Sequence, residues 1–168
     1  MTLAALNSLS LPQLKEALRQ CCGATAWVER MSGRFPVKDI AGLFDAASTI
    51  WRSCTEDDWK EAFSHHPQIG DLASLKQKFA ATAQWAAGEQ AAVQQASEST
   101  LEELAAGNRR YLEKFGYIFI VCATGKSAAE MLHLLEERLP HTPGEEIRVA
   151  MAEQEKITKI RLEKLLIS

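Results

Sequence analysis

The chain has 168 residues, with 19 Lys and Arg against 22 Asp and Glu, which gives a formal net charge of −3. This length is typical of one domain, and we expect residues 1–168 to form a single domain. Hydrophobic residues make up 46% and charged residues 24%, as in ordinary globular proteins. The slightly acidic balance argues against a nucleic-acid-binding surface. No run of about 18 apolar residues is present that could span a membrane.

The termini and the cysteines point to a reducing compartment. Residues 1–10 carry no basic residue ahead of an apolar stretch, so we expect no secretory signal. The chain ends Leu166-Ile167-Ser168 and lacks the peroxisomal Ser-Lys-Leu, which favours the cytoplasm. Its four cysteines form no Cys-x-x-Cys pair, and we expect them to be reduced, buried thiols: Cys21, Cys22, Cys54 and Cys122.

Most of the chain shows the apolar spacing of α-helices. The periodic segments, in chain order, are 11–22, 40–51, 59–63, 80–96, 100–115, 128–139 and 143–166. Several are preceded by a Ser or Thr with Gln, Asp or Glu three positions later, a pattern typical of helix N-caps: Ser10, Thr55, Thr100, Ser127 and Thr142. Gly23 and Gly116 stand where helices should end in a left-handed residue. The sequence therefore predicts an all-α, single-domain bundle of about eight or nine helices.

One segment departs from the helical spacing. Residues 117–122 form a continuous aromatic and β-branched run directly after Gly116, with the composition of a strand. No second comparable run exists to pair with it. We therefore expect a buried, extended connector near 117–123.

Gly125-Lys126-Ser127 follows this run and resembles the end of a phosphate-binding loop. That motif needs another glycine five positions before Gly125, where this chain has Ile120. Two interpretations remain open. The helix start at Ser127 could bind an anion, or it could be a capped turn with a solvated Lys126.

The His65-His66-Pro67 segment is a candidate for chemistry. Pro67 disfavours helical backbone at His66, so a helix should end there. Spacing alone leaves open whether His66 is a structural or a catalytic histidine. A zinc site is disfavoured because no other histidine lies three or four residues away.

Two charged residues fall on apolar helix faces. Glu89 has Trp85 one turn before it, and a carboxylate in such surroundings either needs a partner, for which a histidine is suited, or sits at the rim of a helix interface. Arg161 lies between Ile157 and Leu165. Its guanidinium either reaches water above an apolar stem or binds a carboxylate or polar ring edge.

Taken together, these segments resemble the 2-oxo-4-hydroxy-4-carboxy-5-ureidoimidazoline (OHCU) decarboxylase family, enzymes of urate breakdown in purine metabolism. The resemblance runs in order through almost the whole chain, over 59–70, 89–90, 108–127, 130–138 and 146–165. It implies an all-α fold, no metal, no organic cofactor, and a carboxy-lyase that converts its small-molecule substrate to (S)-allantoin. Family members are often dimers, so a homodimer is also expected.

The resemblance assigns roles by position. His66 matches the family's catalytic histidine and Glu89 its supporting carboxylate. The positions that match substrate contacts are Pro67, Gln90, Phe119, Ile120, Val121 and Arg161, with backbone groups used in the extended run. Ala86 departs from the family, in which a serine often stands at that position, so one substrate hydrogen bond could be missing or come from Thr82 or water.

The expected chemistry fits these residues. Loss of CO2 leaves two electrons that the substrate's own C=N bond can accept, so the protein has to place the carboxylate and move a proton. We expect His66 to make that transfer as base or acid, since an unperturbed imidazole has a pKa near 6.5. Two rival hypotheses are a non-catalytic helical binding module and an anion-binding enzyme that uses Gly125–Ser127.

Overall fold

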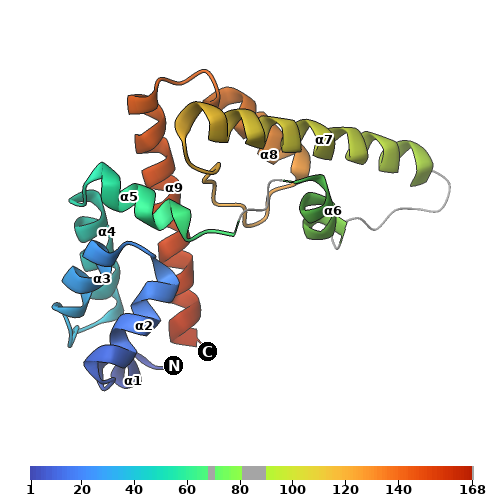
Figure 1. Cartoon of the computed structure of the whole chain (residues 1–168). Helices are drawn as coiled ribbons and strands as arrows, with labels where there is room; N and C mark the ends of the chain where they lie inside the picture. The colour runs from blue at the N-terminus through green and yellow to red at the C-terminus, as the bar shows by residue number, and fades with distance from the viewer. Residues whose placement is uncertain (68–70, 81–89, 168) are drawn as a thin grey trace. The chain divides into compact units, whose positions relative to one another are not determined.

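The computed structural model describes residues 1–67, 71–80 and 90–167, and for 80 and 90–97 the backbone alone. Within these ranges the chain is all-α, as predicted (Figure 1). The helices described are α1 (Leu3–Asn7), α2 (Leu11–Cys21), α3 (Thr25–Ser32), α4 (Ile40–Arg52), α5 (Glu56–Ser64), α6 (Leu72–Ala80), α7 (Gln90–Phe115), α8 (Ala128–Arg138) and α9 (Pro143–Ile167). No helix in the described ranges is long and apolar enough to cross a membrane.

Most of the predicted helix starts are confirmed. Ser10 and Thr55 form capping boxes with Gln13 and Asp58. At the start of α9 the Glu145 carboxylate accepts from the Thr142 N–H at 3.0 Å, and the Thr142 hydroxyl accepts from the Glu145 N–H at 3.3 Å. These reciprocal bonds satisfy backbone N–H groups that have no partner inside a helix.

The helix start predicted at Thr100 is wrong. Thr100 lies inside α7, which runs unbroken from Gln90 to Phe115. The polar stretch before it contains no glycine or proline, so nothing stops the helix there. The segment predicted as a helix over 80–96 is described only at its ends, because 81–89 lie outside the described residues. Helices α1, α3 and α6 were not predicted.

The chain divides into two compact units. Unit 1 comprises Met1–His66, Ile120–Cys122 and Ile147–Ser168, and unit 2 comprises Pro67–Phe119 and Ala123–Glu146. The two termini lie close together in unit 1, where the Met1 amino group donates to the Leu165 carbonyl oxygen at 2.8 Å (Figure 1).

Three buried tryptophans join the helices of unit 1. The Trp27 indole N–H donates to the Ala47 carbonyl oxygen at 3.1 Å, and the Trp51 N–H donates to Met151 at 2.9 Å. The Trp59 N–H donates to the Trp51 carbonyl oxygen at 2.9 Å. A buried indole is stable only when its N–H has a partner, so these bonds fix α3, α4, α5 and α9 against one another.

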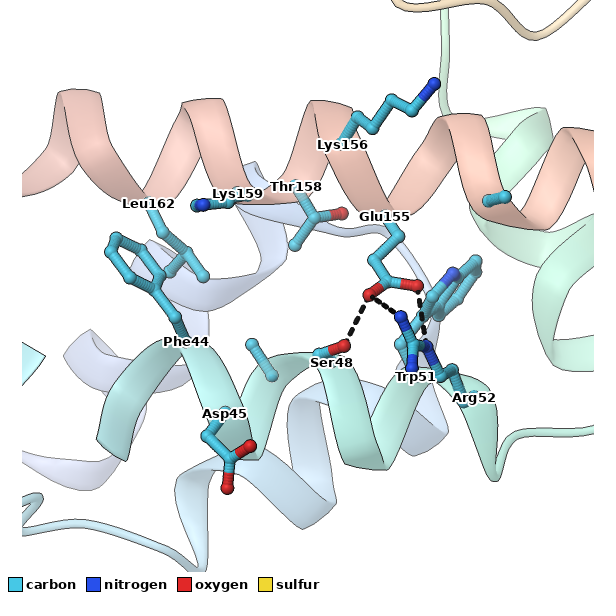
Figure 2. A pocket seen from close by; sticks show the side chains of 12 residues that line it. Phe44, Asp45, Ser48, Trp51, Arg52, Glu155, Lys156, Thr158, Lys159 and Leu162 are labelled. Atoms are coloured by element: carbon cyan, nitrogen blue, oxygen red, sulfur yellow. Dashed lines mark hydrogen bonds and ion pairs between the residues drawn. The ribbon is translucent and has the colours of Figure 1, made fainter. Parts of the chain in front are cut away.

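Helices α4 and α9 enclose a cavity of about 480 Å³ in unit 1 (Figure 2). At its edge the Glu155 carboxylate accepts from the Ser48 hydroxyl and from the Arg52 guanidinium, whose Nη2 lies 3.0 Å away. Phe44 and Leu162 supply apolar lining, and Thr158 also lines the cavity. These contacts join α4 to α9 at the edge of the cavity.

Unit 2 contains a buried carboxylate, Glu146, with its own set of partners. Glu146 is fully buried and accepts from the Tyr111 hydroxyl at 2.6 Å and the Arg138 Nε at 2.7 Å. His141 Nδ1 lies 2.9 Å from its other oxygen. The Arg138 guanidinium also stacks over the Phe119 ring, 4.5 Å from the ring centre. This cluster joins α7, α8 and the first turn of α9 to the extended run.

The expected extended connector is confirmed. Gly116 takes the left-handed conformation, with φ of +81°, and ends α7 as predicted. Residues 117–123 are neither helix nor strand, and Tyr117 and Ile120 are buried. Because such backbone makes few hydrogen bonds within its own segment, its N–H and C=O groups need partners from elsewhere in the fold.

Gly23 is needed for a reason other than the one predicted. Among the described glycines only Gly116 and Gly125 have positive φ, so Gly23 is not a left-handed cap. A Cβ atom built on Gly23 would lie 2.4 Å from Cγ of His65, closer than any real contact. Gly23 therefore lets the junction of α2 and α3 approach the end of α5.

Replacing Glu146 by Gln removes the charge that Arg138 was buried against. We expect the free energy of unfolding to fall by about 3–5 kcal/mol, because an unpaired buried cation is costly. Urea denaturation measures this. The control Glu137→Gln removes an exposed partner of His133 on α8 and should change stability by about 0.5 kcal/mol or less. Equal, small effects in both variants would contradict this account of the cluster.

Replacing Gly23 by Ala should lower the free energy of unfolding by about 1–3 kcal/mol, because His65 has to move. Gly144→Ala is a matched control, since nothing lies within 4 Å of its added Cβ atom. That variant should be neutral or more stable by about 0.4–1 kcal/mol. Equal free energies of unfolding for Gly23→Ala and Gly144→Ala in urea denaturation would contradict the close approach at Gly23.

Candidate active site

The sequence places His66 at the end of a helix, and the structure confirms this. Helix α5 ends at Ser64, with His65 as its C-cap, and the His66 N–H donates to the Phe63 carbonyl oxygen at 3.3 Å. Pro67 follows and prevents the helix from continuing. His66 is held on one side of this break, half-buried in unit 1.

The His66 ring is hydrogen-bonded to α9. Its Nε2 lies 2.5 Å from Oε1 of Gln154, a side chain that is fully buried. The Gln154 amide also donates from its Nε2 to the Thr158 hydroxyl at 3.1 Å, one turn along the same helix. The Gln154 side chain that binds the imidazole is therefore itself held in place by Thr158.

Burial lowers the pKa of His66 below its ordinary value. The positive charge of Arg161 and the neighbouring His65 lower this pKa further, while the bond to Gln154 works in the opposite direction. A lowered pKa keeps the imidazole neutral near pH 7, in which form it can accept a proton.

Arg161 lies in the same region of unit 1. Its Nη1 donates to the Cys21 carbonyl oxygen at 3.4 Å, a long bond to the end of α2. The guanidinium is half-buried. Within the part of the chain that the structure describes, this bond uses one of the five N–H donors of the guanidinium, so a carboxylate or a polar ring edge is a suitable ligand for the others.

The neighbouring thiols are protonated and unreactive. Burial raises the pKa of Cys21 to about 11 and that of Cys22 to about 12. All four cysteines are buried and free, as predicted. Cys21 and Cys22 therefore do not supply a thiolate nucleophile at neutral pH.

The other predicted site residues divide between the units. Ile120 and Val121 are buried residues of unit 1, the unit that holds His66 and Arg161. Pro67 and Phe119 belong to unit 2, where the Phe119 ring contacts Arg138. Gln90 begins α7, and its side chain lies outside the described residues, as do Glu89 and Ala86 entirely. The structure thus brings together His66 and Arg161 and leaves Glu89 and Gln90 untested.

Gln154 and Thr158 were missed from the sequence. Both are buried on the inner face of α9, in line with Ala150 and Leu162. Polar residues at positions where the helical spacing requires apolar ones are the signal that could have found them. The spacing of four between Gln154 and Thr158 also permits their mutual hydrogen bond.

The turn at Gly125–Ser127 has the capped form. The Ser127 hydroxyl accepts from the Glu130 N–H at 3.2 Å, which uses one of the donors that an anion would need. The 480 Å³ cavity between α4 and α9 does not include His66 or Arg161 in its lining. Across the described ranges, no group of three His, Cys, Asp or Glu side chains is placed to hold a metal ion.

Comparison with known proteins places the chain. The family pattern described as OHCU decarboxylase matches residues 7–163. A uric acid degradation bifunctional protein TTL from Arabidopsis thaliana is 40% identical over 147 residues, which is 86% of this chain and 45% of that protein. An OHCU decarboxylase from Halalkalicoccus jeotgali is 24% identical over 98% of this chain and 92% of its own.

Solved structures agree with these matches. A crystal structure of an OHCU decarboxylase in the presence of (S)-allantoin matches with a TM-score of 0.72 and 38% identity, over 92% of this chain and 99% of the other. The chain spans less than half of the bifunctional relatives, 45% of the Arabidopsis protein and 32% of one from a Bacillus strain. Because the family pattern covers both units from residue 7 to residue 163, the chain belongs to the OHCU decarboxylase family.

Proposed function

We propose that this chain decarboxylates 2-oxo-4-hydroxy-4-carboxy-5-ureidoimidazoline to (S)-allantoin, with His66 as the residue that transfers the proton. The observation that carries the proposal is the His66 imidazole, half-buried, held by Gln154 and close to the charge of Arg161. A relative with 38% identity that was crystallised in the presence of (S)-allantoin supports the choice of product.

The reaction requires electron movement that the substrate can accommodate. The bond to the carboxylate breaks as CO2 leaves, and its electron pair moves into the ring toward the C=N nitrogen, which takes a proton from water. The ring hydroxyl then loses its proton as a carbonyl forms, and the carbon that carries the ureido group gains a proton. The protein's tasks are to orient the ring and to move these protons.

His66 suits the first proton transfer because its lowered pKa leaves a neutral base at pH 7. Once protonated, the imidazolium can return a proton to one face of the ring, which would set the (S) configuration. Arg161 would hold the substrate carboxylate or a ring oxygen until CO2 leaves. Glu89 would stabilise the imidazolium, and Gln90, Pro67 and backbone groups over 119–121 would contact the ring. These last roles rest on the resemblance.

The free, buried cysteines favour a cytoplasmic location for the enzyme, and the resemblance favours a homodimer. Size-exclusion chromatography with light scattering tests the assembly. A mass near twice the 18.6 kDa of the chain is expected, and a mass equal to one chain would contradict a dimer.

Replacing His66 by Asn should lower kcat by about 10²–10⁴-fold, because a general base is lost while the polar shape is kept. The substrate is generated from urate with urate oxidase and hydroxyisourate hydrolase, and (S)-allantoin is followed by circular dichroism. His133→Asn, at an exposed position on α8, should retain wild-type turnover. Wild-type protein that yields racemic allantoin at the uncatalysed rate would refute the decarboxylase. Full turnover by the His66 variant would refute the role of His66.

The pH profile should follow the lowered pKa of His66. A base must be neutral to act, so kcat/KM should stay high below pH 6.5 and fall only at still lower pH. In Arg161→Gln the positive charge is gone, and an NMR titration should show the pKa of His66 moving up. Arg19→Gln removes an exposed charge on α2 and should leave this pKa unchanged. A fall in kcat/KM that begins above pH 6.5 would contradict the neutral base.

A further inference from the structure

Gln154 is an unusual residue for the inner face of a helix. It is fully buried, and its amide is hydrogen-bonded to His66 on one side and to Thr158 on the other. A buried amide without partners costs several kcal/mol, roughly 2–7. A purely apolar helix face would avoid that cost, so the amide's contact with His66 calls for an explanation.

The amide is oriented with its NH2 group toward Thr158 and its carbonyl oxygen toward His66. The Thr158 hydroxyl accepts from the Gln154 NH2 group at 3.1 Å, and the same hydroxyl is a hydrogen-bond partner of the Cys22 thiol. The raised pKa of Cys22 keeps that thiol neutral. With its NH2 group engaged by Thr158, the amide presents its carbonyl oxygen to His66.

A carbonyl oxygen only accepts hydrogen bonds, so the His66 nitrogen that faces it has to carry the hydrogen. That nitrogen is Nε2. A neutral imidazole carries one N–H, so Nδ1 then has the free lone pair. No hydrogen bond from the described part of the chain reaches Nδ1.

We propose that Gln154 is a positioning residue that holds neutral His66 as the Nε2–H tautomer and leaves Nδ1 as the atom that takes the substrate's proton. The assignment of Nδ1 to the proton transfer rests on the proposed function, whereas the tautomer does not. The charged and titratable groups that act on the ring are Arg161 on α9 and His65 at the end of α5. Arg161 opposes a positive charge on the ring before substrate binds.

The tautomer can be measured directly in the wild-type protein. Long-range ¹H–¹⁵N NMR correlations of neutral His66 should identify Nε2 as the protonated nitrogen and Nδ1 as the bare one. Protonation at Nδ1, or an even mixture of tautomers, would overturn the proposal. This result does not depend on any variant folding or on the identity of the substrate.

Kinetics test the consequence for turnover. Gln154→Leu should lower kcat by about 10–100-fold, the range seen when a partner that orients a histidine is removed, with little change in KM. Gln154→Glu keeps an acceptor oxygen at the same place and should restore most of the turnover. Its negative charge should also move the acid limb of the kcat/KM profile to higher pH. Glu163→Leu, at an exposed position on α9, serves as the matched control and should behave as wild type.

The outcomes separate this inference from the proposed function. Wild-type kinetics and an unchanged pH profile in Gln154→Leu would refute the positioning role. Loss of turnover in both Gln154 variants, with no shift of the acid limb in Gln154→Glu, would also refute it, since a structural role alone predicts that pattern. An Nε2–H tautomer together with full turnover in His66→Asn would refute the proposed role of His66 and leave the tautomer assignment standing.

Discussion

The hydrogen bond between His66 and Gln154 is the contact on which the rest of the candidate site depends. His66 stands at the end of α5, where Pro67 prevents the helix from going on, and nothing in α5 itself fixes the ring. Helix α9 supplies the acceptor from a residue 88 positions away in the sequence. The tryptophan bonds that hold α3, α4 and α5 to α9 keep the two helix segments in register for it. Substitutions that break these tryptophan hydrogen bonds should therefore change the position of the His66 imidazole.

Polar groups buried in this chain are used in two ways. In unit 2, Glu146 is paired with Arg138 and Tyr111, so that a full charge is neutralised and the extended run is anchored through Phe119. In unit 1, the buried amide of Gln154 is neutral and sets the state of a titratable ring. In the first arrangement the buried carboxylate and its partners satisfy one another's hydrogen bonds. The second leaves one ring nitrogen available, which is what proton transfer requires.

Much of the fold could be predicted from local sequence, and the site only in part. Caps at Ser10, Thr55 and Thr142 were readable because the bonds involved span three residues. Thr100 shows the same pattern, but the helix start predicted there is wrong. A capping pattern alone does not interrupt a helix when no glycine or proline precedes it. His66 and Arg161 could be named as candidates from their sequence positions, but their proposed roles rest on the resemblance. Gln154 was missed because its hydrogen-bond partner, His66, is far away in the sequence. Helical spacing does not reveal such long-range contacts.

Binding of the reaction product tests the central claim most directly, because allantoin is a defined molecule that can be supplied in either configuration. The ¹⁵N signals of His66 are followed while (S)- or (R)-allantoin is added to the wild-type protein. The account predicts that (S)-allantoin shifts the Nδ1 signal, leaves Nε2 bound to Gln154, and has a larger effect than (R)-allantoin. Equal and negligible shifts with both configurations, or a shift confined to Nε2, would contradict it.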